Sequence, residues 1–214
     1  MLQRFHRKVN MNYIIVDTET TDLPNKKLGT WPKMISIALI HTTITNGEMD
    51  IYSEDEYFVT DWVDELQEDT SKFLNLDKAT ILKKSVPFDT VKTNITKLIN
   101  ECGGPDKVTF VAHNASFDYN VIKMCGLDLR ACKWFCTMTY GYLYFKQNKY
   151  PKLLELAKLF NISVDDTKLH GALYDTQVCC HIFYCIQTNN FSTKRISTRV
   201  LELRNRSIEI LVDD

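Results

Sequence analysis

The sequence predicts a single mixed α/β domain, and two features of the chain indicate this fold class. Near the beginning, β-forming segments flank an Asn-Gly pair that is typical of a β-hairpin. Further along, short apolar segments alternate with segments whose apolar residues recur at helical spacing. Hairpin strands followed by alternating strands and helices are characteristic of a mixed sheet flanked by helices. A chain of 214 residues is long enough to bury a substantial core in such a domain.

The first elements expected are strands. The apolar segment that begins at Tyr13 predicts a strand over about 12–17. MISIALIHTTI (34–44) is rich in β-forming residues, and DIYSEDEYFV (50–59) is the expected return strand. Between these two segments, Asn46-Gly47 is a strong signal for a tight hairpin turn.

The later part of the chain predicts helices and one more buried strand. Apolar residues between Phe88 and Ile99 recur with helical spacing. VTFVA (108–112) is a second buried strand, followed by a helix. Pro151 opens a further amphipathic helix, because proline is favoured at the first helical position. The last clear helix is expected from about 171 to 187.

The chain divides into three parts on composition. Residues 1–11 are polar and basic, which predicts a flexible arm. Residues 12–190 hold all the elements above and form the domain. Residues 191–214 mix charged and aliphatic residues, and this C-terminal extension is expected to be a further helix or a pairing segment that could serve a homodimer.

Charge and cysteine content narrow the function classes. A formal net charge of −1 excludes a strong global basic field, so a nucleic-acid partner would depend on local patches or bound cations. No segment has the roughly 20 apolar residues of a membrane span, and the first residues lack a secretory signal. Seven cysteines without zinc-like spacing predict reduced thiols in an intracellular, reducing compartment, cytoplasmic or nuclear. The lysine- and arginine-free segment from Glu48 to Asp69 fits a solvated face or an acidic surface that repels misplaced nucleic acid.

Two acids end the first strand. Asp17 and Glu19 are two residues apart, so in a strand they point to the same face and can converge on one point. Two carboxylates held close together repel unless a cation lies between them, and Mg²⁺ prefers oxygen ligands of this kind. The pair therefore predicts a metal site, although by itself it also fits a surface feature.

Two later segments carry further acids. In VAHNASFD (111–118), a strand and a turn precede Asp118, which falls in the first turns of a helix that Asn114 can cap. In HGALYD, His170 comes five residues before Asp175. Five residues correspond to about 140° around a helix, so the two side chains do not share a face. This spacing fits a His170 on the preceding loop and an Asp175 that points inward from the helix, although each segment alone also fits a local structural role.

Taken in order, D-x-E, H-N-x-x-F-D and H-x-x-x-x-D resemble the motifs of the DEDDh 3′–5′ exonucleases, the DnaQ-like branch of the ribonuclease H-like superfamily. The resemblance covers residues 13–187, and the segments 85–99 and 136–162 resemble the helices that the family places between its motifs. It implies an α/β, ribonuclease H-like mixed β-sheet flanked by helices, with residues 12–190 as the exonuclease domain. Two positions depart from the family: Asp22 stands where a glycine is common, and Ser36 stands where a glutamate is common.

The resemblance also implies roles for individual residues. Two Mg²⁺ ions, which Mn²⁺ could replace, would be held by four carboxylates: Asp17, Glu19, Asp118 and Asp175. His170 would be the general base, and Asp17 the acid that both ions share. The residues expected to contact substrate are Thr20, Leu23, His113 and Asn114. Leu23 would wedge against the last base or hold its loop down, and the His113-Asn114 pair would contact the backbone or fix the turn.

The activity implied is metal-dependent 3′–5′ hydrolysis that releases nucleoside monophosphates from a nucleic acid with a free 3′ end. DNA with single-stranded ends is the favoured substrate, in proofreading, repair or degradation, and a polymerase or other replication protein is a possible partner. The alternatives are an RNA exonuclease similar to oligoribonuclease, a catalytically silent nucleic-acid-binding module, and an interaction protein with a fortuitous motif set. No membrane partner is expected.

Overall fold

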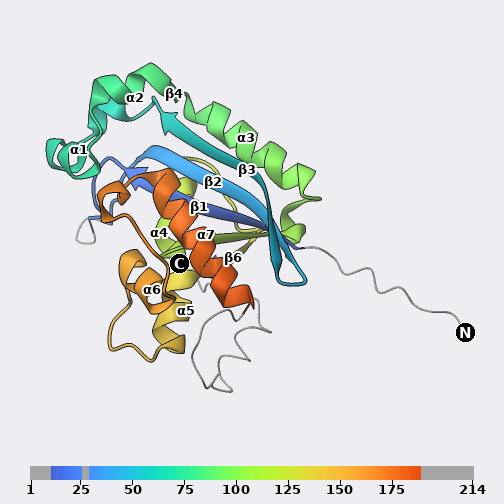
Figure 1. The fold of residues 1–214 in the computed structure, drawn as a ribbon. Coiled ribbons are helices and arrows are strands. Elements are labelled where there is room, and N and C mark those ends of the chain that lie inside the picture. The colour runs from blue at the N-terminus through green and yellow to red at the C-terminus, as the bar shows by residue number, and fades with distance from the viewer. Residues whose placement is uncertain (1–10, 26–28, 189–214) are drawn as a thin grey trace, which may run out of the picture.

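The computed structural model describes residues 11–25 and 29–188, and its centre is a six-stranded sheet in the order β4-β3-β2-β1-β5-β6 (Figure 1). The strands are β1 (Asn12–Thr20), β2 (Met34–Thr45), β3 (Glu48–Val59), β4 (Ser85–Val86), β5 (Val108–Ala112) and β6 (Lys133–Cys136). The expected arm, except for Met11, and the expected extension over 191–214 lie outside the described residues.

Helices cover both faces of this sheet. The α-helices are α1 (Glu68–Leu74), α2 (Lys78–Lys84), α3 (Phe88–Glu101), α4 (Ala115–Met124), α5 (Thr137–Tyr144), α6 (Leu153–Leu159) and α7 (Ala172–Thr188). The short 3₁₀ turns are η1 (Val63–Glu65), η2 (Pro105–Lys107) and η3 (Asp166–Lys168). The predicted mixed sheet flanked by helices is therefore confirmed.

The strand directions explain where a site can form. β1, β2 and β3 pair antiparallel, and the hairpin between β2 and β3 turns through Asn46 and Gly47, both at positive φ, as predicted. β1 also pairs parallel with β5, and β5 pairs parallel with β6. The carboxyl ends of β1, β5 and β6 consequently meet at one edge of the sheet.

Successive side chains of β1 point to opposite faces of the sheet, so they pack into two different hydrophobic clusters. Ile14 and Val16 face the layer of α3 and α4, in a cluster that includes Ile95 and Ile122. Ile15 faces the opposite side, where it packs in a cluster with residues of α7 such as Phe183. Figure 1 shows α7 crossing one face of the sheet, with α3 along the other and α5 and α6 beside β6. Asp17 and Glu19 share the parity of Ile15, so they point to the α7 side.

Several short elements were not predicted from the sequence. These are β4, β6, α1 and α2, which have two to seven residues each, too few for a hydrophobic period to be recognised. The start of α6 was predicted two residues too early: Pro151 lies before the helix, which begins at Leu153 after the N-cap Lys152. Glu155 accepts the backbone N–H of Lys152, and this bond fixes the helix start.

Two further observations bear on the sequence expectations. All seven cysteines lie within the described residues, and they are present as free thiols. None of the helices in residues 11–25 and 29–188 combines the length and the hydropathy that crossing a bilayer requires.

Candidate active site

Three of the four predicted acids converge. Asp17 and Glu19 from β1 and Asp175 from α7 each offer a carboxylate oxygen, and these oxygens lie within 4.8 Å of one another. The three side chains are half-buried at the edge of the sheet where the parallel strands end. This arrangement brings together residues from the first strand and the last described helix.

Local geometry explains the convergence. The side chains of Asp17 and Glu19 lie on the same face of β1, and the register shift between Glu19 and Thr20 ends the regular strand. Asp175 lies in the first turn of α7, where its backbone N–H bonds to the carbonyl of Gly171. Because α7 packs on β1 and β2, that first turn lies over the end of β1.

The cluster carries unbalanced negative charge. Burial raises the pKa of Asp17 well above its usual value, and the carboxylates of Asp118, Glu19 and Asp175 raise it further. Burial also raises the pKa of Glu19 to about 8, and each charged neighbour that adds to this shift is itself an acid. Each of these carboxylates makes ionisation of the others less favourable. A bound cation would offset the repulsion and favour the ionised form, so the cluster is suited to a cation.

Asp118 approaches from the other side of the sheet. It is buried in the first turn of α4, and Thr18 donates a hydrogen bond of 2.8 Å from its Oγ1 to Oδ1 of Asp118. Burial raises the pKa of Asp118 to about 7, while the Thr18 hydrogen bond opposes that rise. Asp118 is not one of the three acids that share a 4.8 Å group, but its charge acts on both Asp17 and Glu19. Thr18 was not predicted as a site residue from the sequence. Its position between Asp17 and Glu19 could have indicated such a role.

His170 stands at the mouth of the cluster. It lies on the loop before α7, as its spacing from Asp175 predicted, with an exposed side chain and a φ of 70°. Its backbone N–H donates to Oδ2 of Asp175 over 3.3 Å. Burial raises the pKa of Asp175 to about 6, and the His170 backbone bond lowers it in part.

The end of β1 and the turn that follows it hold the next two predicted residues, Thr20 and Leu23. Thr20 is buried and its hydroxyl donates to the carbonyl of Asp22, so it fixes the turn. Leu23 is 79% exposed, which does not fit the expectation that it holds its loop down by packing. Asp22, which stands where the family often has glycine, is not among the positive-φ residues, so its backbone does not need glycine. Its carboxylate instead accepts the backbone N–H of Leu23.

His113 and Asn114 follow β5. Both ring nitrogens of His113 are engaged, Nδ1 with the hydroxyl of Thr137 and Nε2 with the carbonyl of Pro151, each at 3.0 Å. Burial lowers the pKa of His113 to about 4, so the ring is neutral and ties the turn after β5 to the segment before α6. Asn114 has a φ of 73° and makes no side-chain cap of α4, contrary to expectation. The left-handed turn, which asparagine tolerates, is its structural contribution.

A hollow of about 530 Å³ lies between the segment after β1 and the start of α4, next in sequence to Asp118. It is lined by residues of two segments, the turn after β1 and the start of α4, including Leu23, Trp31, Asn114 and Phe117. The rings of Trp31 and Phe117 are 6.2 Å apart between centroids. Leu23 and Asn114 were predicted as substrate contacts, whereas Trp31 was not, because an isolated tryptophan in a loop gives no pattern.

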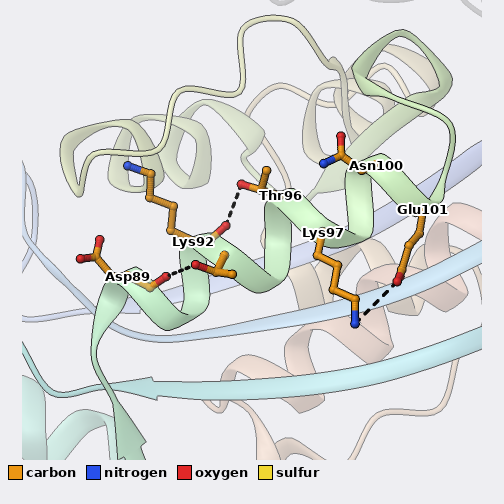
Figure 2. A pocket seen from close by; sticks show the side chains of 7 residues that line it. Asp89, Lys92, Thr96, Lys97, Asn100 and Glu101 are labelled. Carbon is orange, nitrogen blue, oxygen red and sulfur yellow. Dashed lines mark hydrogen bonds and ion pairs between the residues drawn. The ribbon is translucent and has the colours of Figure 1, made fainter.

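A second hollow, of about 830 Å³, runs along the outer face of α3 (Figure 2). Its lining includes Asp89, Lys92, Lys97 and Glu101, and Lys97 pairs with Glu101 at 3.7 Å. Figure 2 shows these side chains spread along one helix face. None of the predicted site residues lines this hollow, and it has the character of a solvated helix surface.

Known proteins resemble this chain over most of its length. A family model described as an exonuclease, RNase T, matches residues 14–183. The DNA polymerase III subunit epsilon of Rickettsia prowazekii (strain Madrid E) is 22% identical over 207 residues, which are 94% of this chain and 84% of that protein.

Solved structures show the same fold. One reports 3′-end-specific recognition of a histone mRNA stem-loop by a 3′-exonuclease, with a TM-score of 0.69, 13% identity and coverage of 85% of this chain and 84% of that one. Another is the nuclease domain of 3′hExo, a DEDDh family member, bound to rAMP, with a TM-score of 0.67, 13% identity and coverage of 89% and 99%. At these identities the structures establish the fold, while the family model extends over nearly all of the described domain. The chain belongs to the RNase T exonuclease family, and its fold is that of a DEDDh family member, the group that its motifs resemble.

Proposed function

We propose that this protein is a metal-dependent 3′–5′ exonuclease that releases nucleoside monophosphates from the 3′ end of nucleic acid, with single-stranded DNA ends as the favoured substrate. The observation that carries the proposal is the convergence of Asp17, Glu19 and Asp175 within 4.8 Å. Carboxylates with raised pKa values at one point form an oxygen-donor set that suits Mg²⁺.

The proposed donor set would hold two ions. Asp17 would be shared, Glu19 and Asp175 would complete one ion, and Asp118 would hold the second from the α4 side. Bound there, Mg²⁺ or Mn²⁺ supplies the positive charge that a phosphodiester anion needs when a further anionic oxygen attacks it. The Thr18 hydrogen bond keeps the Asp118 carboxylate oriented and favours its ionised form.

His170 would take the proton from the attacking water. The water oxygen forms a bond to phosphorus, the bond from phosphorus to the 3′ oxygen of the preceding nucleotide breaks, and that oxygen leaves with a proton as a 3′-hydroxyl. An exposed imidazole on a loop can approach the water once substrate is bound, and histidine is the side chain that most often serves as a general base.

The hollow between the segment after β1 and the start of α4 would hold the terminal nucleotide. Its apolar lining includes Leu23, Trp31 and Phe117, and apolar or aromatic surfaces stack on any base. Asn114 lines the same hollow. Thr20 and His113, whose side chains bond within the protein, would act by holding the two turns that frame the hollow.

The names of the similar proteins refer to different nucleic acids, some to DNA and some to RNA. The name of the sequence relative refers to a DNA polymerase, which supports DNA and a polymerase partner. The structure titles refer to an mRNA stem-loop and to rAMP, which keeps an RNA exonuclease as the second candidate. Discrimination depends on contacts to the 2′ position of the sugar.

The test is digestion of matched single-stranded DNA, duplex DNA and short RNA, labelled at the 5′ end, with Mg²⁺ or Mn²⁺. We expect a ladder that shortens from the 3′ end, nucleoside monophosphates as product, faster turnover of single-stranded DNA, and loss of activity in Asp17→Ala. Faster turnover of RNA would select the second candidate. Binding of all three substrates without hydrolysis would select a silent module.

A further inference from the structure

A ring contact spans the mouth of the site. The ring of Phe73, from α1, lies 4.2 Å from the ring of His170 between centroids, with an interplanar angle of 43°. The two residues come from different connections of the fold, the one between β3 and α3 and the one before α7. Phe73 is nevertheless 63% exposed, so it is not part of the hydrophobic core.

The short helix α1 is fixed relative to the catalytic strand. The backbone N–H of Gln67, its N-cap, donates to the carbonyl of Thr21 in the turn after β1. At the other end, Leu74 is buried and Asn75 adopts a left-handed conformation that ends the helix. The helix that carries Phe73 is therefore held in place at both ends. Leu74 packs into the protein, whereas the neighbouring Phe73 points away from that packing and remains exposed.

The side chain of His170 is held differently from its backbone. The backbone has a positive φ, which is costly for a residue other than glycine, and its N–H bonds to Asp175. Within residues 11–25 and 29–188, no hydrogen bond engages either ring nitrogen of His170. Its imidazole makes the tilted ring contact with Phe73, and its charge also acts on Asp175.

We propose that Phe73 is a positioning residue that holds the His170 imidazole at the mouth of the site, ready for the attacking water. The proposal rests on the proposed function, in which His170 takes the proton. An aromatic pair restricts the ring without using the nitrogens, so both remain available for proton transfer. A polar partner would occupy one nitrogen and change its basicity.

The test is a double-mutant cycle of Phe73→Ala and His170→Ala under single-turnover conditions with enzyme in excess. We expect Phe73→Ala to lower the rate of hydrolysis about three- to tenfold, the range that an aromatic pair supports, with unchanged affinity for the oligonucleotide. In the His170→Ala background the same change should cost nothing further, because its effect passes through the imidazole. An equal loss in both backgrounds, or weaker oligonucleotide binding, would show that Phe73 acts on substrate directly and would overturn the proposal.

Controls separate this effect from folding. Leu82→Ala removes another large apolar side chain, 51% exposed, from the neighbouring helix α2, and should leave the rate unchanged. Phe73→Tyr should restore the rate and Phe73→Leu should not, because only an aromatic ring reproduces the tilted ring contact.

A second readout does not depend on activity. The carbon-bound ring protons of His170 should show NMR shifts displaced by the ring current of Phe73, and Phe73→Ala should remove the displacement while Leu82→Ala leaves it. If the displacement is lost but His170→Ala retains wild-type turnover, the contact exists and the proposed role of His170 has failed. If His170→Ala is inactive but the displacement is unaffected by Phe73→Ala, the positioning proposal has failed and the proposed function stands.

Discussion

The imidazole of His170 is exposed, whereas the backbone of the same residue is tied to Asp175. Removal of the imidazole should therefore affect proton transfer without dismantling the acidic cluster. We expect His170→Ala to lower kcat by about 10²–10⁴-fold, the usual contribution of a general base, with nearly unchanged Mn²⁺ affinity. Steady-state kinetics and calorimetric Mn²⁺ titration measure the two quantities.

The matched control for this change is Lys168→Ala, an exposed residue at the end of η3, two positions before His170, that pairs with Asp165. It should keep wild-type turnover. Equal losses in the two variants would mean that the loop, and not the imidazole, is what the mutation disturbs.

The acids Glu19, Asp118 and Asp175 should make the metal-free protein sensitive to pH. Their pKa values in the folded protein are raised to about 8, 7 and 6, above those of unfolded carboxyl groups near 4. The folded state therefore binds more protons than the unfolded state over this interval, and stability falls as pH rises. The stabilisation from these groups is fully present below about pH 4 and is lost as pH rises through about 6 to 8.

Thermal unfolding in EDTA across this interval measures the effect. We expect Tm to fall between about pH 5.5 and 8.5, and Glu19→Gln to raise Tm at the upper end by at least about 2–4 °C, which corresponds to about 1 kcal/mol. Asp89→Asn, an exposed acid on α3, should change neither value. A Tm that is level across the interval, or that rises with pH, would contradict the charge distribution described for this cluster.

Among the elements, α5 and α6 pack closely at a glycine. A Cβ on Gly141 of α5 would lie 2.5 Å from Cδ1 of Leu156, which is fully buried in α6. We expect Gly141→Ala to destabilise the protein by about 1–3 kcal/mol, the usual cost of overpacking. Urea unfolding measures it, and in a Leu156→Ala background the added cost should vanish, because the clashing atoms are gone. If the losses of stability from Gly141→Ala and Leu156→Ala were additive, the added methyl group would not be clashing with Leu156.

The length of an element decided whether the sequence could predict it. The hairpin of β2 and β3 was predicted because Asn46-Gly47 marks the turn, and α3 because its apolar residues repeat over 14 residues. β6 has four residues and α1 has seven, so neither shows a period. The contact between Phe73 and His170 depends on α1, and for that reason it could not be predicted either.

For the whole molecule, the order of the motifs made the site predictable. Asp17, Glu19 and Asp175 were identified because their spacings recur in a known order, and the fold brings these three together. The hollow of about 530 Å³ was not predictable, since it joins Trp31 to Phe117 across segments with no shared pattern. The tether from His113 to Pro151 was missed for the same reason.

A metal site built from β1 and α7 should stabilise the whole fold. Ions that bind only the folded state raise its stability, by about 2.7 kcal/mol at a concentration 100 times Kd. We therefore expect Mg²⁺ to raise Tm by several degrees at pH 8, measured by calorimetry. In Asp175→Asn most of the rise should disappear, whereas Asp89→Asn should retain it. An equal rise in wild type and Asp175→Asn would place the ions elsewhere.

The long interval between the first strand and the last described helix has a consequence for biosynthesis. A chain leaving the ribosome presents Asp17 and Glu19 early, but Asp175 only after most of the domain has been translated. Until α7 emerges and docks on β1, the nascent polypeptide lacks one of the three carboxylates that converge in the folded protein. Under the proposed function, hydrolysis would therefore begin only after α7 has docked, when synthesis of the domain is nearly over.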